Sequence, residues 1–380
     1  MRCALDVHGV RIAIESDCAA ALEGVRSDFR FFAREASAAS APPHVALRLA
    51  LEPGALPPAA PAGTRFLFRS GGNAVRAGKG VRYVAHHGGA ALTVFDPRED
   101  TATIHAASAA VLRATAYLFL LSRAGARLDR MGRHRAHALA LAVGGRAVLF
   151  LAGSGVGKTT LGLSLMARGR NVAWLADEIP ILDRSLLVRP FPLPPRLVAG
   201  SPVPWPPPPV PLAPVARSKP PEKVQIDVGA ILPRVAKGAP LAAVFTCDRR
   251  ASAGPTHVRE AGIATALPQL LRYLVLGRDF PHTKAFWLGF TPRAIAEEAA
   301  VGASRAALAA KILASVPAYS VAMSGDLRES ASAVADAIEN RLGFPLAAGD
   351  ASDGDDGLDD FLGGKGERPC SDATDATGIS

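Results

Sequence analysis

The fold is decided by residues 151–160, which read Leu-Ala-Gly-Ser-Gly-Val-Gly-Lys-Thr-Thr. This stretch matches the phosphate-binding loop G-x-x-x-x-G-K-[ST] at every fixed position except the first, where Ala152 replaces glycine. Such a loop needs glycines because its backbone N–H groups turn inward around a phosphate, where side chains would block the approach. We therefore predict a nucleotide-binding loop made of Gly153, Ser154, Gly155, Val156, Gly157, Lys158, Thr159 and Thr160.

The residues on either side of the loop suit this prediction. Residues 146–151 are apolar and predict a buried strand, and residues 159–168 predict a helix whose N-terminal dipole faces the bound anion. In such a loop Lys158 carries a positive charge to the β- and γ-phosphates, and the Thr159 hydroxyl ligates Mg²⁺. The expected cofactors are therefore ATP and Mg²⁺.

Two apolar segments, 137–143 and 146–151, precede the loop and are separated by Gly144-Gly145. Both central positions of a two-residue turn can take positive φ when they are glycines, so this pattern predicts a β-hairpin. The loop is then entered from an antiparallel pair of strands. Most phosphate-binding loops instead follow a strand with parallel neighbours, so the hairpin reduces the number of P-loop families to which this chain could belong.

An acidic pair follows the next predicted strand. Residues 172–176 are apolar and end at Asp177-Glu178, which places two carboxylates at the carboxyl edge of the sheet, where phosphates bind in α/β proteins. One carboxylate can help to hold Mg²⁺, and the other can accept the proton of an attacking hydroxyl. A solvated turn or a helix cap is the alternative without a function.

Taken together, these features resemble the catalytic domain of HPr kinase/phosphorylase and its kinase relatives. The resemblance is carried by His137, Gly144-Gly145, residues 153–159, Arg168-Gly169 and Ala176-Asp177-Glu178. It is densest over residues 136–183 and extends more weakly to about Leu342. The resemblance implies an α/β fold in which a P-loop domain of the HPr kinase/phosphoenolpyruvate-carboxykinase-like type carries the site. It also implies catalytic roles for Asp177 as base or acid, for Lys158 and for His137, and metal contacts from Thr159, Glu178 and Asp177.

The chain departs from the bifunctional members of that family. They carry Ser-Glu after the loop lysine, an Asp-Asp pair and a later Glu-x-x-Gly-x-Gly segment, whereas this chain has Thr159-Thr160 and Asp177-Glu178 and lacks the glycine segment. These departures point away from phosphorolysis and from HPr as substrate. We expect an ATP-dependent kinase that transfers the γ-phosphate to a hydroxyl, foremost a serine of a protein or peptide. A small-molecule kinase and a noncatalytic ATP-binding switch are the alternatives.

Composition bounds the remaining choices. The 380 residues are 49% hydrophobic and carry a net charge of +9, which combines −7 on residues 350–380 with +16 on the rest. The excess of positive charge comes mainly from scattered arginines, so we expect no nucleic-acid partner. The four cysteines show no C-x-x-C pairing, and no apolar run reaches the roughly 18 residues of a membrane span. We expect a cytoplasmic protein with no membrane partner, and a homo-oligomer is compatible with the sequence.

We predict three regions along the chain. Residues 1–128 form a small α/β region, with a hairpin at 5–15, a helix at 17–33, strands at 45–51, 65–69, 80–86 and 91–95, and a helix at 104–123. Residues 129–344 form the P-loop domain, with strands at 223–228 and 241–246 and helices at 268–276, 292–315 and 327–342. The helix after the loop is predicted to end at Gly169, a C′ residue, and the last helix to begin with a capping box of Asp326 and Glu329. The proline-dense stretch 189–221 of this domain predicts an extended surface loop beside the acidic pair. Residues 345–380 predict a disordered acidic tail.

Overall fold

The predicted hairpin, loop and helix are present in the computed structural model. Strand β11 (Ala138–Val143) pairs with β12 (Arg146–Leu151), and Gly144 and Gly145 between them both have positive φ. Helix α3 (Lys158–Arg168) follows the loop. The structure describes residues 1–35, 41–53, 56–198, 210–211, 223–249, 254–277, 284–287 and 291–347.

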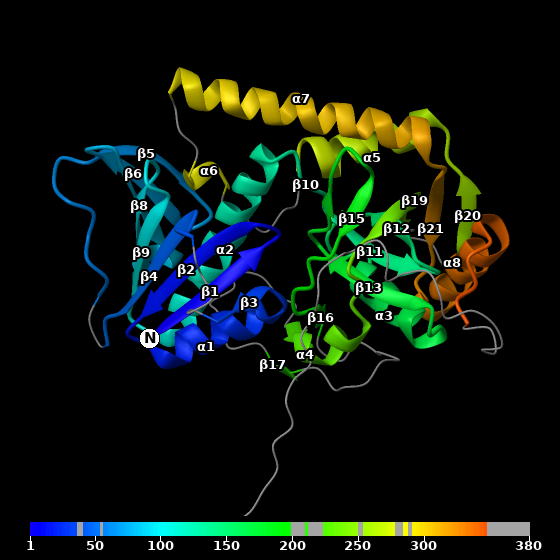
Figure 1. Ribbon diagram of the computed structural model, residues 1–380, viewed down its shortest axis with the longest axis horizontal. Helices are drawn as coiled ribbons and strands as arrows, with labels where there is room; N and C mark the ends of the chain where they lie inside the picture. The colour runs from blue at the N-terminus through cyan, green and yellow to red at the C-terminus, as the bar shows by residue number, and fades with distance from the viewer. Residues whose placement is uncertain are drawn as a thin grey trace, which may run out of the picture. The chain divides into compact units, whose positions relative to one another are not determined.

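The strands around the loop form a mixed sheet (Figure 1). Its order is β10 (His134–Arg135), β14 (Ile181–Leu182), β15 (Leu187–Arg189), β19 (Ala239–Arg249), β12, β11 and β13 (Val172–Asp177), with β21 (Ala318–Met323) on β19 and β20 (His257–Glu260) on β21. β12 is antiparallel to β11, and β11 is antiparallel to β13, so β12 and β13 run in the same direction. Leu151 pairs with Ala138, and Asp177 pairs with Leu139. The register therefore brings the loop and the acidic pair level at one edge of the sheet, about 10 Å apart across two strand spacings.

Helices cover both faces of this sheet, which explains why every residue of β11 is buried. Leucines of β11 pack into one core with α3 and α8 (Leu327–Leu342). The alternating alanines of β11 pack into a second core with α5 (Ile263–Leu270), the π-helical turn Leu271–Val275 and α7 (Pro292–Ser315). A strand that is buried on both faces reads as a continuous apolar run, as residues 138–143 do.

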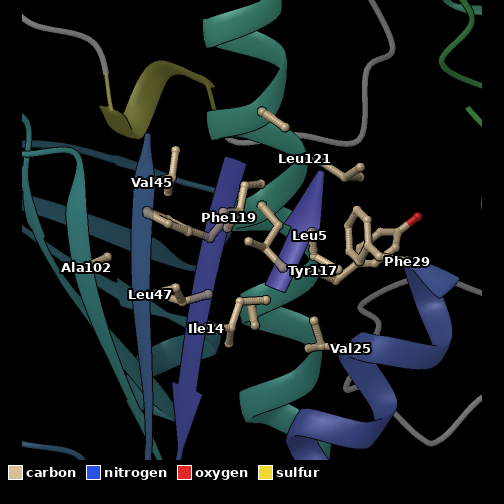
Figure 2. Close-up of a cluster of buried hydrophobic side chains, with 14 of the residues drawn as sticks. Leu5, Ile14, Val25, Phe29, Val45, Leu47, Ala102, Tyr117, Phe119 and Leu121 are labelled. Carbon is tan, nitrogen blue, oxygen red and sulfur yellow. The ribbon is translucent and has the colours of Figure 1, made fainter. Parts of the chain in front are cut away.

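A second mixed sheet is built from the N-terminal residues. Its strands, in spatial order, are β3 (Ala33–Arg34), β1 (Arg2–Val7), β2 (Val10–Ser16), β4 (Val45–Leu51), β9 (Thr101–Ala106), β8 (Ala91–Asp96), β7 (Val81–His86), β6 (Asn73–Gly78) and β5 (Arg65–Ser70). Helices α1 (Ala19–Asp28) and α2 (Ala109–Arg130) pack against it. Figure 2 shows their shared core, in which Phe29 and Tyr117 lie with ring centroids 5.6 Å apart. The mixed α/β class is thus confirmed.

The core of the N-terminal sheet continues into the residues that flank the acidic pair. Ala176 and Ile179 belong to this core, together with Phe191. The Phe191 ring lies 4.9 Å from the ring of Phe32, and the His8 ring hydrogen-bonds the carbonyl of Pro190 at 2.6 Å. Residues 1–347 form one compact unit, and our predicted boundary after residue 128 stays a prediction.

Several local predictions were wrong in detail. The helix predicted at 17–33 spans only 19–28, because residues 30–32 form a 3₁₀ turn. The helix predicted to begin at Ile104 begins at Ala109 behind the Ser108 cap, because residues 101–106 pair with β4 and β8. β6 was not predicted, and the predicted strand 223–228 is only Lys223–Gln225 (β18) before α4 (Val228–Ile231).

Two helix ends also differ from expectation. The sequence suggests a left-handed Gly169 after α3, but Gly169 has an extended φ of −146°. Glycine is needed there for close approach, because a Cβ would lie 2.0 Å from the carbonyl oxygen of Leu346. Asp326 caps α8 as predicted, yet Glu329 bonds Thr256 instead of closing a capping box.

The proline-dense stretch is not simply a surface loop. Residues 191–195 are buried, because Phe191 and Leu193 belong to the N-terminal core. β16 (Arg196–Val198), β18 and β17 (Val210–Pro211) then form a small sheet, in which Lys223 pairs with Val198. The rest of the predicted loop, at 199–209 and 212–221, and the predicted tail beyond 347 lie outside the described residues. No helix in the described ranges is long and apolar enough to cross a bilayer.

Candidate functional site

The loop between β12 and α3 has the backbone of an anion cradle. Gly155 and Gly157 have φ of +84° and +109°, which residues with a Cβ rarely adopt. Gly157 also stands immediately before α3, so the loop leads its amides to the positive end of the helix dipole. These conformations explain why glycine stands at both positions.

Side chains from two helical segments lie close to this loop. A Cβ on Gly157 would lie 2.8 Å from a methyl carbon of Leu327, the first residue of α8, and a Cβ on Gly153 would lie 3.3 Å from the Tyr273 hydroxyl. Tyr273 lies in the π-helical turn and is buried. Neither residue was predicted, since a helix-forming stretch does not reveal which of its side chains meets a distant loop.

Lys158 is held inside the site by three acceptors. Its Nζ donates to the carbonyl oxygens of Ala152 at 2.7 Å and Gly153 at 3.0 Å, and it lies 3.2 Å from Nε2 of His137. An ammonium group has three N–H donors and no acceptor, so His137 accepts through Nε2 and carries its ring proton on Nδ1. Only 7% of Lys158 and 2% of His137 is exposed. The predicted juxtaposition of His137 with the loop is therefore present.

Asp177 contacts the residue after Lys158, which is Thr159. The Thr159 hydroxyl donates to Oδ2 of Asp177 at 2.5 Å. Asp177 is only 5% exposed, and among the described residues its Oδ1 is a buried oxygen without a hydrogen-bond partner. Buried carboxylate oxygens are seldom left unpartnered, because desolvation without a hydrogen bond is costly. Such an oxygen suits a ligand that brings its own donor or cation.

Burial raises the pKa of Asp177 to about 6, and the neighbouring Glu178 carboxylate adds to the shift. Glu178 is half-buried and has a φ of +74°, an uncommon backbone conformation for a residue with a side chain. Backbone conformations of this kind concentrate at functional sites, where the surrounding structure imposes them. The acidic pair thus combines one buried carboxyl of high pKa with one carboxylate that reaches water.

The residues present fit a magnesium nucleotide. The glycine backbone and Lys158 match the charge of phosphates, and the buried Oδ1 of Asp177 beside Thr159 offers hard oxygen ligands. Within the described ranges, no group of three or more His, Cys, Asp or Glu side chains could hold a metal by itself. That is compatible with Mg²⁺, which proteins commonly bind through one or two carboxylates together with substrate phosphates.

The pKa of Asp177 predicts how stability depends on pH in the nucleotide- and metal-free protein. A carboxyl whose pKa is higher in the folded than in the unfolded state stabilises below its unfolded value, and this contribution is lost as pH rises through about 6. Asp177→Asn is therefore expected to gain on the order of 2 kcal/mol relative to wild type between pH 4.5 and pH 7.5. Urea unfolding at both pH values measures this difference.

Asp183→Asn is the matched control for this experiment. The hydrogen bonds from Ser185 and Arg189 outweigh burial and lower the pKa of Asp183, so its contribution is present at neutral pH and lost on acidification. The Asn variant at 183 should therefore become less stable relative to wild type as pH rises, opposite to the variant at 177. The same pH trend in both variants would contradict the assignment.

The structure brings all the predicted site residues to one edge of the sheet. The loop residues 153–160 lie there with Asp177 and Glu178, and His137 reaches Lys158 from the start of β11. Sequence reasoning missed Arg196, which stands on the Tyr117 ring with its Cζ 4.8 Å from the ring centroid. The signal in the sequence that could have identified Arg196 is a charged residue within a stretch of prolines and leucines. No protein-family model matches the chain, and no curated protein is significantly similar to it.

Proposed function

We propose that this chain is an ATP-dependent kinase that transfers the γ-phosphate to a hydroxyl, foremost a serine of a protein or peptide. The observation that carries the proposal is the contact between Thr159 and Asp177 at 2.5 Å, which joins the loop to the acidic pair. The resemblance of residues 136–183 to HPr-kinase-related enzymes supports the same activity. A phosphate-binding loop alone is compatible with many activities, whereas a buried carboxylate of raised pKa beside it suits proton transfer.

In this reaction Asp177 acts as the general base. Its carboxylate accepts the proton of the acceptor hydroxyl while that oxygen bonds to the γ-phosphorus, the bond to the β,γ-bridging oxygen breaks, and ADP leaves. A pKa of about 6 leaves Asp177 mostly ionised at neutral pH yet basic enough to accept a proton. Thr159 and the acidic pair would hold Mg²⁺, which would neutralise charge on the phosphate oxygens.

Lys158 stabilises the negative charge on the phosphoryl group as it moves. To do so its Nζ exchanges the carbonyls of Ala152 and Gly153 for phosphate oxygens, while His137 offers a neutral acceptor that holds the amine nearby. His137 is thereby a positioning residue for Lys158. The His137 ring also lies 5.8 Å from that of Tyr273, and the backbone N–H of His137 donates to the Tyr273 carbonyl at 2.9 Å, which fixes the position of His137.

Glu178→Gln is expected to raise the Mg²⁺ concentration for half-maximal activity about tenfold, because the amide removes one charge from the metal's surroundings. The maximal rate at saturating Mg²⁺ should change little. A titration of activity against Mg²⁺ measures both quantities. Glu297→Gln, in an exposed ion pair with Arg293 on α7, is the control and should leave the titration unchanged. A loss of maximal rate with an unaltered Mg²⁺ requirement would mean that Glu178, not Asp177, is the base.

The proposal itself is tested with γ-labelled ATP and a lysate from the source of the protein. The expected result is a labelled macromolecule whose phosphate is stable to acid, as a serine phosphoester is, and whose labelling disappears in the Asp177→Asn variant. Label only in small molecules would indicate a small-molecule kinase. Rapid ATP hydrolysis with no labelled product would contradict the kinase proposal and favour a nucleotide-dependent switch.

A further inference from the structure

Arg196 is a half-buried cation whose hydrogen-bonding capacity is not fully used. Its guanidinium lies on the face of the Tyr117 ring, and among the described residues its Nε is buried without a hydrogen-bond partner. A guanidinium stacked in this way directs its N–H donors outward in its own plane, where they can take an anion bidentately. The nearby carboxylate of Asp28 is already held bidentately by Arg113, at 2.9 and 2.6 Å.

Arg196 lies near the nucleotide site because the segment that precedes it in sequence pairs with the end of β13. Phe191 donates to the carbonyl of Leu175 at 2.8 Å and forms a parallel bridge with Ala176, the residue before the acidic pair. Five residues later β16 packs against α3, and Leu197 joins the core that contains Leu161 of that helix. Arg196 is thus anchored between the end of β13 and the helix that begins with the phosphate-binding loop.

The electrostatic surroundings of Arg196 agree with this position. Its pKa is raised, first by Tyr117 and then, against the opposing effect of burial, by the carboxylates of Glu178, Asp28 and Asp177. Both members of the acidic pair are therefore close enough to act on the guanidinium. Tyr117 comes from α2, so the N-terminal region supplies the surface on which Arg196 rests.

We propose that Arg196, positioned by the Tyr117 ring, binds a phosphate-type dianion on the acceptor side of the acidic pair, namely the phosphoryl group after transfer. This inference rests on the proposed kinase activity and deepens it. The loop and Lys158 hold the phosphates of the nucleotide, and Arg196 holds the phosphate that has left it. A second cation beside the acidic pair, in addition to Lys158, suits a group that moves between two oxygens, because each end of its path then carries positive charge.

The test uses the full chain saturated with Mg·ADP and inorganic phosphate as the probe. Isothermal titration measures the affinity for phosphate, and a separate titration measures the affinity for Mg·ADP. Arg196→Met is expected to weaken phosphate binding about tenfold or more, which is typical for the loss of charge-assisted hydrogen bonds, and to change the Mg·ADP affinity less than twofold. Arg196→Lys should restore part of the phosphate affinity, since it keeps the charge without the planar fork.

Variants of Tyr117 test the positioning role. Tyr117→Phe keeps the ring and should bind phosphate as wild type does, whereas Tyr117→Leu should weaken binding. Arg341→Met is the matched control, because Arg341 also stands over a tyrosine ring, that of Tyr319 at 5.9 Å, and its guanidinium donates a hydrogen bond to the carbonyl of Val258. It should lose no phosphate affinity.

The outcomes separate this inference from the proposed function. Phosphate binding that is absent from the wild-type Mg·ADP form, or unchanged in Arg196→Met, would overturn the role of Arg196 while leaving the kinase proposal intact. Failure of the wild-type chain to bind Mg·ADP would overturn the proposed function and this inference with it. A parallel titration with O-phosphoserine distinguishes the sources of the anion: equal weakening in Arg196→Met supports a phosphoester product, and weakening for free phosphate alone contradicts the assignment to the transferred group.

Discussion

Replacing Lys158 with alanine is expected to lower the rate of phosphoryl transfer by about 10²–10³-fold, in a protein that remains folded. The substitution removes the ammonium group that is proposed to contact the moving phosphate, and no other side chain on the loop carries a positive charge. The glycine backbone and the dipole of α3 persist in the variant, so binding of Mg·ATP should weaken but not vanish. Single-turnover kinetics with an identified acceptor measures the rate, and nucleotide titration measures the binding.

Lys311→Ala is the control for this substitution. Lys311 also donates to a main-chain carbonyl, that of Arg184 at 2.7 Å, but it lies exposed on α7. Its loss should leave both rate and nucleotide affinity unchanged. Near-normal transfer by the Lys158 variant, at the same fraction of folded protein, would remove the central claim about the loop.

The Asp177→Asn variant is expected to transfer phosphate about 10²–10⁴-fold more slowly than wild type, because an amide of the same size cannot accept the hydroxyl proton. Mg·ATP affinity should fall much less than the rate, because the loop, Lys158, Thr159 and Glu178 are intact. The variant should also be more stable than wild type at neutral pH, since it no longer buries a charge. Loss of activity together with gain of stability distinguishes a functional carboxylate from a structural one.

The dependence of rate on pH gives a second readout for the same residue. If Asp177 is the base, wild-type kcat/KM should rise with pH through the pKa of Asp177, near 6, and this limb should be missing from the residual activity of the variant. Asp183→Asn, six residues later, should keep the wild-type profile. An unchanged profile in the Asp177 variant would rule out its role as base.

Much of the candidate site could be predicted from local sequence. The glycines of the loop, the Gly144-Gly145 turn and the apolar runs on both sides depend on backbone conformation and on burial within a few residues, so the pattern of residue types carries them. The register of β11 with β12 and β13 follows from the hairpin and from burial of both faces. The joint position of Lys158, Thr159 and Asp177 therefore needed little tertiary information.

The errors and omissions have a common cause. Residues 191–195 look like a surface loop because prolines lack N–H donors, yet they are buried because the N-terminal core covers Phe191 and Leu193. Gly169 looks like a helix stop, yet it is glycine because the chain at Leu346 returns against it. In each case a contact with residues distant in sequence decides the local structure.

The sequence by itself determined the phosphate-binding loop, the hairpin that leads into it and the acidic pair that follows, because each depends on interactions between near neighbours. Only the tertiary structure decided that Tyr273 and Leu327 lie against the loop, and that Tyr117 supports Arg196 beside the acidic pair. Those contacts join residues brought together by the packing of two sheets and their helices. Such packing depends on the complementary shapes of whole surfaces, which no short stretch of sequence encodes.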